Sequence, residues 1–226
     1  MSMIEFCGVR HGYGDRSVLK GIDLVLTERR IGIVGANGSG KSTLARMVNG
    51  LVRPDNGTVT VDGLDVARNG REVRRRVGFV FTNPDSQIVM PTVAEDVAFT
   101  LRRRGLSKAD VATRVAAALE RFGLAGHADH PAHRLSGGQK QLLALAAVLV
   151  AEPAIVVADE PTTLLDARNT RRIGELLGSL DQQLIVVTHQ LELIEGFDRV
   201  LVVDEGVIVA DGSPDESLGA YRSLIA

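Results

Sequence analysis

The fold of this chain is decided by one stretch, Gly35-Ala36-Asn37-Gly38-Ser39-Gly40-Lys41-Ser42, which follows the apolar run 31–34 and precedes a helix-like segment at 43–48. A strand, a glycine-rich loop and a helix in this order are the setting in which a phosphate-binding loop occurs. The sequence therefore predicts a protein that binds a nucleoside triphosphate.

The backbone of this loop supplies the physical reason. Gly35, Gly38 and Gly40 have no Cβ, so the loop can curl until successive N–H groups point inward, and the following helix adds the positive end of its dipole. We expect Lys41 to reach the β- and γ-phosphates and the Ser42 hydroxyl to ligate Mg²⁺. The alternative is a glycine-rich turn that caps an ordinary helix and leaves the lysine in solvent.

Composition restricts the class of protein. The 226 residues are 45% hydrophobic, enough for a substantial core, and the net charge of −2 argues against a general nucleic-acid binder. Cys7 is the single cysteine, so no internal disulfide forms and a reducing cytosolic setting fits best. The longest charge-free helical stretch, 142–151, is about half of the ~20 residues that a membrane-spanning helix needs, and the first residues lack a secretory signal. Any role at a membrane is therefore expected to come through a partner.

Short β-branched and apolar runs recur along the chain and predict an α/β fold. Several are continuous rather than alternating, as expected for strands buried on both faces of a mainly parallel sheet. The predicted strands are 4–9, 22–26, 31–34, 58–61, 77–81, 154–158, 184–188, 200–203 and 207–210.

The pattern becomes helical between Pro91 and Leu124. Two segments, 92–95 and 107–110, have the sequence of a capping box, and each is predicted to open a helix. We therefore expect a helical subdomain over 91–133, inserted between 1–90 and 134–226 of an α/β core.

A second glycine motif, Leu135-Ser136-Gly137-Gly138-Gln139-Lys140-Gln141, follows this insertion and precedes an apolar helix. Ser136 is placed as an N-cap, and the two glycines expose backbone N–H groups at the positive end of that helix. Alone, this pattern is more typical of an ordinary helix cap than of an anion site.

Two further sites carry polar side chains at the ends of predicted strands. Asp159 and Glu160 follow an apolar strand, and because successive side chains of a strand alternate, the two acids can serve different roles. Asp159 is expected to hold Mg²⁺, directly or through water, and Glu160 to deprotonate the attacking water. His189 follows the next predicted strand and can donate a hydrogen bond to the γ-phosphate, although a purely structural hydrogen bond is the alternative.

With these residues in order, the chain resembles the ATPase subunits of ATP-binding-cassette transporters over nearly its whole length. The resemblance implies one ATPase domain with a mainly parallel sheet core, an N-terminal antiparallel β part and a helical subdomain, and it implies ATP and Mg²⁺ as ligands. Segment 135–139 matches the signature motif and His189 the switch histidine. The implied catalytic residues are Glu160 and His189, and the implied metal ligands are Ser42, Gln87 and Asp159. The implied ATP contacts are Tyr13 (stacking on adenine), Gly35, Asn37, Gly38, Ser39, Gly40, Lys41, Ser42, Thr43, Gln87, Ser136, Gly137, Gly138 and Gln139.

The family also implies partners. Its ATP lies between the glycine-rich loop of one subunit and the signature motif of another, so we expect a closed dimer, favoured as a homodimer. Integral membrane subunits are expected to contact the Gln87 region and to hold the chain on the inner face of the cell membrane. One departure is Leu164 in Thr163-Leu164-Leu165-Asp166, where the family commonly has alanine between the subunits.

A narrower resemblance concerns Asn83-Pro84-Asp85-Ser86-Gln87, which is similar to a segment of energy-coupling-factor ATPases for vitamin and transition-metal uptake. The compact length is similar to that of the biotin transporter ATPase, so biotin is the favoured substrate and cobalt or nickel the next. Two other hypotheses remain open at this point, namely a soluble non-transport ATPase of the same superfamily and a catalytically silent nucleotide-binding module.

Overall fold

The computed structural model describes residues 2–102 and 104–225, which form two compact units. The first unit comprises 2–79, 154–160 and 180–225, and the second comprises 80–153 and 161–179. The division predicted from the sequence, with boundaries at 91 and 134, stays a prediction.

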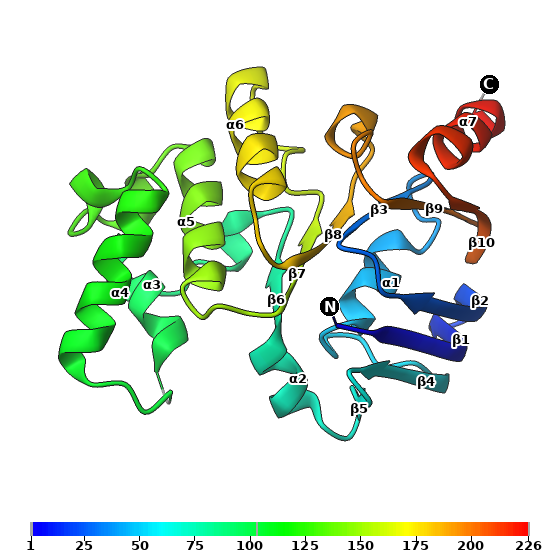
Figure 1. Cartoon of the computed structure of the whole chain (residues 1–226), viewed down its shortest axis with the longest axis horizontal. Helices are drawn as coiled ribbons and strands as arrows, with labels where there is room; N and C mark the ends of the chain where they lie inside the picture. The colour runs from blue at the N-terminus through cyan, green and yellow to red at the C-terminus, as the bar shows by residue number, and fades with distance from the viewer. Residues whose placement is uncertain (1, 103, 226) are drawn as a thin grey trace. The chain divides into compact units, whose positions relative to one another are not determined.

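The first unit contains two β-sheets (Figure 1). The antiparallel sheet has the strand order β2-β1-β4-β5, and the larger sheet has the order β10-β9-β3-β8-β7-β6, with β3, β7, β8 and β9 parallel to one another. This confirms the predicted α/β class with an N-terminal antiparallel part. The strands are β1 (Ile4–Tyr13), β2 (Arg16–Leu26), β3 (Arg30–Val34), β4 (Asn56–Val61), β5 (Leu64–Asp65), β6 (Val77–Val80), β7 (Ile155–Asp159), β8 (Gln183–Val187), β9 (Arg199–Asp204) and β10 (Val207–Gly212).

The strands at the centre of the larger sheet are almost fully buried, as their continuous apolar sequences predict. Every residue of β7 and of β8 is buried, and the parallel register aligns Asp159 with Val187 at their carboxyl ends. Ligand sites of open parallel sheets lie at the carboxyl ends of the strands. The edge that carries Val34, Asp159 and Val187 is therefore where a site is expected.

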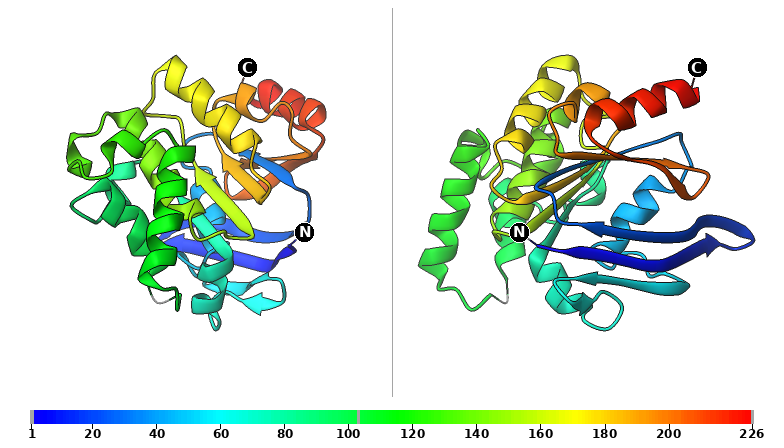
Figure 2. Two further views of the ribbon diagram at one scale, coloured as in Figure 1. Left: turned by 60° about the vertical axis from the view of Figure 1, so that its left-hand side comes forward. Right: turned by 45° about the vertical axis from the view of Figure 1, so that its right-hand side comes forward.

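Three helices belong to the first unit. Helix α1 (Lys41–Met47) contacts β7 and β8 of the larger sheet and also β2 of the antiparallel sheet. Helix α2 (Gly70–Arg76) contacts β5, and α7 (Pro214–Ile225) lies over β9 and β10 (Figure 2). Because α1 packs against both sheets, its first turn is fixed from two sides.

The second unit is mainly helical, which confirms the predicted helical subdomain as an element of the fold. Both predicted capping boxes are formed, by Thr92 with Glu95 and by Ser107 with Asp110. The helices α3, α4 and α5 pack against one another through apolar side chains, among them the fully buried Val93. The elements are α3 (Val93–Leu101), α4 (Lys108–Arg121), α5 (Gly137–Leu149), α6 (Ala167–Gly178) and short 3₁₀ turns at Pro84–Ser86, Ala125–His127 and Ala132–Arg134; a fourth 3₁₀ turn, Leu191–Leu193, belongs to the first unit. Within the described residues, no helix has the length and apolar character needed to cross a membrane.

The first two strands are longer than the sequence predicts. β1 continues past the predicted end at Val9 to Tyr13, and β2 begins at Arg16 rather than at Ile22. The register between them shifts near Gly8, whose φ is +55°, so the alternation of side chains is broken although the pairing continues. Because such a bulge shifts the alternation of side chains, a sequence pattern based on alternation does not detect the part of the strand beyond it.

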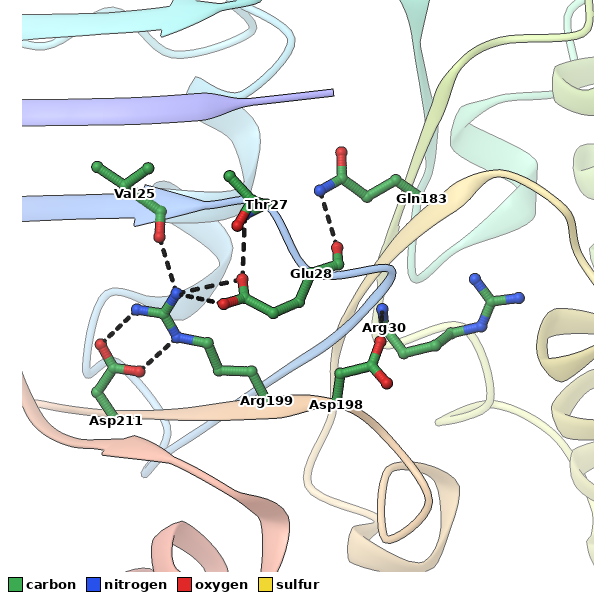
Figure 3. A network of polar contacts seen from close by, with 8 residues as sticks. All are labelled: Val25, Thr27, Glu28, Arg30, Gln183, Asp198, Arg199 and Asp211. Carbon is green, nitrogen blue, oxygen red and sulfur yellow. Dashed lines mark hydrogen bonds and ion pairs between the residues drawn. The ribbon is translucent and has the colours of Figure 1, made fainter. Parts of the chain in front are cut away.

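An arginine network joins strands of both sheets within the first unit (Figure 3). The guanidinium of Arg199 donates to both carboxylate oxygens of Asp211, at 2.6 and 2.7 Å, to Glu28 at 3.0 Å and to the carbonyl of Val25 at 2.8 Å. Hydrogen bonding to Asp211 raises the pKa of Arg199. Burial alone raises the pKa of Glu28, but hydrogen bonds from the backbone N–H groups of Glu28 and Thr27 and the charge of Arg199 outweigh it, so its pKa lies below the ordinary 4.5.

We expect Arg199→Met to lower the free energy of unfolding at pH 7 by about 2 kcal/mol, because it leaves two partly buried carboxylates without their cation. A carboxyl group whose pKa is lowered by folding contributes stability above its unfolded pKa and loses it as pH falls through the folded pKa. The difference between variant and wild type should therefore shrink below about pH 4.5. Urea unfolding at pH 7 and at pH 4 measures both values. A stability difference that grows in acid would contradict the stabilising role of the ion pairs that Arg199 forms with Asp211 and Glu28. The free energy of unfolding of Arg199→Lys should lie between those of wild type and Arg199→Met.

Candidate nucleotide-binding site

A cavity of about 350 Å³ lies in the first unit at the amino end of α1. Its lining brings together residues from β1, β2, the glycine-rich loop and the end of β7. Those predicted from the sequence are Tyr13, Asn37, Gly38, Gly40, Lys41, Ser42, Thr43 and Glu160. The loop, the aromatic side chain and the acid therefore share one cavity.

The glycines of the loop are required by its backbone. Gly35, Gly38 and Gly40 have φ values of +148°, +80° and +109°, in the region that side chains with a Cβ rarely adopt. A Cβ at Gly35 would also collide with the carbonyl oxygen of Val203. Ser39 is only 4% exposed, and its backbone carbonyl accepts a hydrogen bond from Gly206. The loop is thus anchored to the turn between β9 and β10 while its residues 37, 38 and 40 face the cavity.

Lys41 is nearly buried, with 6% of its surface exposed. Its Nζ donates hydrogen bonds to the carbonyl oxygens of Gly35 and Ala36, both at 2.8 Å. Burial lowers the pKa of Lys41, while the charges of Glu160 and Asp159 oppose this change. The ammonium is therefore held over the loop in an environment where an additional anion would stabilise its charge.

Ser42 and Asp159 meet at the carboxyl end of β7. The Ser42 hydroxyl donates to Oδ1 of Asp159 at 2.7 Å, and Arg46 Nη2 donates to Oδ2 at 2.9 Å. Asp159 is fully buried. A hydroxyl and a carboxylate are the hard oxygen donors that Mg²⁺ takes beside phosphate oxygens, so this pair fits the predicted metal. Among the described residues, no cluster of three or more acidic, histidine or cysteine side chains suited to a metal ion occurs.

Glu160 and His189 are brought together from the ends of two neighbouring strands. His189 Nδ1 lies 2.8 Å from Glu160 Oε2, and the Glu160 side chain is 15% exposed while His189 is 52% exposed. The backbone of Glu160 has a φ of +53°, which a residue with a Cβ adopts only under constraint. Its N–H donates to the carbonyl of Val187, and this bond holds the turn that aims the carboxylate into the cavity.

Tyr13 ends β1, is 54% exposed and lines the cavity. Its ring meets His11 edge-on, with centroids 4.8 Å apart and planes at 89°. The backbone N–H of Gly12 donates to the carboxylate of Asp55, which directly precedes β4. This bond ties the end of β1 to the start of the neighbouring strand. The aromatic side chain is therefore held in place by its neighbours.

Gln87 lies in the second unit, where its side chain is already hydrogen bonded. Its Oε1 accepts from the backbone N–H of Phe81 at 3.2 Å, and its Nε2 donates to the carbonyl of Ala144 in α5 at 3.3 Å. Asp85 beside it forms an ion pair with Lys140 of α5 at 2.7 Å. The segment around Gln87 is therefore tied to the helix that begins at the second glycine motif.

The second glycine motif forms the predicted cap of α5. Ser136 Oγ accepts from Gln139 N, and the side chain of Gln139 accepts from Ser136 N, which completes a capping box. Gly137 is exposed, whereas Gly138 is buried, and a Cβ there would collide with the Asn169 side chain of α6. Gln139 Nε2 also lies 3.0 Å from His127 Nε2. Packing against Asn169 thus requires a glycine at 138, whereas Gly137 is exposed.

Two charged residues near these groups escaped prediction. Arg46 binds Asp159, and its position one helical turn after Ser42 is the signal that could have indicated it. Asp96 is 3% exposed and accepts hydrogen bonds from the N–H groups of Val89 and Met90, which fixes the chain after Gln87. Nothing in its local sequence separates it from an ordinary acidic residue in the first turn of a helix.

Comparison with known proteins identifies similar chains. The family model described as ABC transporter matches residues 19–163. A biotin transport ATP-binding protein of Rhizobium etli is 45% identical over 223 residues, which cover 99% of this chain and 99% of that protein. A cobalt import ATP-binding protein of Syntrophus aciditrophicus is 42% identical over 221 residues, covering 94% of this chain and 79% of that protein.

A solved structure supports the same relationship. The structure of a subunit of an ABC transporter complex from Clostridium perfringens superposes with a TM-score of 0.84 at 32% sequence identity. The match covers 98% of this chain and 92% of that one.

Proposed function

The chain belongs to the ABC transporter family, whose ATP-binding subunits hydrolyse ATP to power transport, and we propose that it energises an energy-coupling-factor importer for a vitamin or transition metal, with biotin as the favoured substrate. The observation that carries the proposal is the joint placement of Lys41, Ser42 and Glu160 in one cavity, in a chain that also has the Asn83–Gln87 segment.

We propose a division of work within the cavity. Tyr13 stacks on adenine, and the N–H groups of the loop from Gly35 to Thr43, together with Lys41, bind the phosphates. Glu160 orients and deprotonates the attacking water, which requires a carboxylate close to the phosphate and shielded from bulk solvent. Nδ1 of His189 donates to the ionised Glu160 carboxylate, so His189 would donate to the γ-phosphate through Nε2 with both ring nitrogens protonated.

Ser42 and Asp159 are proposed to hold Mg²⁺, which when bound neutralises charge on the β- and γ-phosphate oxygens. The hydrogen bond from Ser42 to Asp159 directs the hydroxyl proton toward the carboxylate, so the lone pairs of Ser42 Oγ remain for a cation. Gln87 is proposed as a further ligand. Its amide oxygen, which accepts from the backbone N–H of Phe81, would have to exchange that bond for the metal.

Ser136 to Gln139 are proposed to bind the ATP of a second ATPase subunit, favoured as a second copy of this chain. Ser136 and Gly137 are exposed at the amino end of α5, where backbone N–H groups favour an anion. Leu164 in the neighbouring loop is 62% exposed, and an apolar side chain this open is consistent with burial in a dimer. Stronger binding of ATP by the closed dimer would drive closure.

The surface next to Gln87 is proposed to contact the integral membrane subunits, which would hold the chain on the inner face of the membrane. A cavity of about 300 Å³ lies there, lined by Asp85, Ile88, Met90 and His133 among others, and Val89 at its edge is 62% exposed. The same segment carries Gln87 and is tied to α5 by the ion pair between Asp85 and Lys140, and we propose that this tie couples Gln87 to the surface.

Biotin is favoured over cobalt because the biotin transport relative is matched at higher identity than the cobalt import relative. The difference, 45% against 42%, is small, so the experiment must measure both substrates. The transported molecule is expected to bind to a membrane subunit rather than to this chain.

The test is co-expression of the chain with the membrane proteins encoded beside its gene, followed by uptake of labelled biotin and of labelled cobalt. We expect the chain to co-purify with a membrane protein and biotin to accumulate only when ATP hydrolysis is intact, with Glu160→Gln as the inactive control. Uptake of cobalt alone would replace biotin as the substrate. Failure to associate with any membrane partner, combined with binding to ribosomes or DNA, would contradict the transporter assignment.

A further inference from the structure

Arg46, Ser42 and Asp159 form a small hydrogen-bonded network at the carboxyl end of β7. Arg46 lies one turn after Ser42 on α1, so both side chains project from the same face of the helix. Each uses a different oxygen of Asp159, with Ser42 Oγ at 2.7 Å from Oδ1 and Arg46 Nη2 at 2.9 Å from Oδ2. The carboxylate is therefore held at both oxygens by a single helix.

The contact joins a partly exposed arginine side chain, 39% exposed, to a fully buried carboxylate. Asp159 has no exposed surface, and a buried carboxylate is stable only when it is paired and hydrogen bonded. The Nε of Arg46 is buried and has no hydrogen-bond partner among the described residues, which is unfavourable for an N–H group.

We infer that Arg46 is a positioning residue for the metal site: it fixes the rotation of the Asp159 carboxylate, and Asp159 in turn orients the Ser42 hydroxyl. With its proton directed to Oδ1, Ser42 Oγ turns its lone pairs to the cation. Groups that orient a metal ligand without touching the metal commonly contribute 10- to 100-fold to its affinity. The inference rests on the proposed Mg²⁺ site and is independent of the transported substrate.

Arg46→Met keeps much of the side-chain volume but removes the charge and the donors. The measurement is equilibrium binding of a fluorescent ATP analogue during a titration with Mg²⁺. We expect the Mg²⁺ concentration that gives half of the affinity gain to rise about 10-fold, while affinity without Mg²⁺ changes by less than about 2-fold. Arg46→Lys, which retains a cation but not the planar fork, should recover part of the loss. Arg53→Met, at an exposed arginine soon after α1, is the matched control.

Each result decides between specific explanations. A lower melting temperature with an unchanged Mg²⁺ midpoint would make Arg46 purely structural and overturn the inference, as would a lowered midpoint, which would make Arg46 a competitor of the metal. If Arg46→Met fails to fold, Arg46→Lys carries the test, and a wild-type midpoint in that variant overturns the inference. If Mg²⁺ does not raise the affinity of the wild-type protein, the proposed metal site itself is wrong and the role of Arg46 falls with it.

Discussion

Glu160→Gln is expected to reduce ATP turnover by about 10²- to 10⁴-fold and to leave ATP binding intact, because it removes a general base while keeping the shape of the side chain. The surroundings of Glu160 can accept a glutamine with little disturbance. The carboxylate lines the cavity and contacts His189 at 2.8 Å, and the amide of glutamine can keep a hydrogen bond to that ring. Phosphate release measures turnover, and equilibrium binding of ATP measures affinity.

The control for Glu160→Gln must separate lost chemistry from a disturbed backbone, since Glu160 has a φ of +53°. Glu205 also has a positive φ, +43°, and is exposed in the turn between β9 and β10. Glu205→Gln therefore repeats the chemical change at a similar backbone conformation outside the cavity and should hydrolyse ATP normally. Unchanged turnover in Glu160→Gln would remove Glu160 from the mechanism.

The elements that the sequence predicts well are those with local signals. The strand before the glycine-rich loop begins at Arg30, one residue before the predicted start, and both capping boxes form as predicted. The family was predicted from motifs in a fixed order and is confirmed by the match over 19–163. Glycine loops, caps and buried β-branched runs are all determined by neighbouring residues, and for this reason they can be read without the fold.

The elements that the sequence does not predict depend on long-range contacts. β1 and β2 extend to Tyr13 and from Arg16 because each pairs with the other across irregular register, which no alternation within one strand reveals. β5 has only two residues, and its pairing with Thr60 and Val61 of β4 alone defines it. Tertiary pairing here overrides the local pattern.

The site shows the same contrast. Each of Lys41, Ser42, Asp159 and Glu160 belongs to a motif, and the structure places their side chains around one cavity or in direct contact with its lining. Arg46 lies outside the motifs that identify these four residues. Its contact with Asp159 depends on the fold, because β7 brings Asp159 beside α1 although the two residues are more than a hundred positions apart in sequence.

Lys41→Ala is expected to weaken ATP binding by about 1.5–3 kcal/mol, or roughly 10- to 150-fold in Kd, the usual contribution of a charge-assisted hydrogen bond. Hydrolysis should fall with it, because the same ammonium stabilises the charge that moves during phosphoryl transfer. Lys41 is 6% exposed and sits over the carbonyl groups of Gly35 and Ala36, so it is already in place before the nucleotide binds. Lys41→Arg is expected to recover little, since the larger planar group does not fit a position shaped for an ammonium.

The loss in Lys41→Ala should depend on the phosphates of the ligand, and this dependence distinguishes a phosphate contact from general damage to the loop. AMP has neither a β- nor a γ-phosphate, so its affinity should be equal in wild type and variant, whereas ADP and ATP should both bind more weakly. Lys20→Ala, at an exposed lysine of β2, should behave as wild type toward all three nucleotides. A uniform loss for AMP, ADP and ATP would mean that the alanine collapses the loop, because Lys41 also holds two of its carbonyl groups. Wild-type affinity for ATP would show that the triphosphate does not use Lys41, and the phosphate-binding role of the loop would then have to be abandoned.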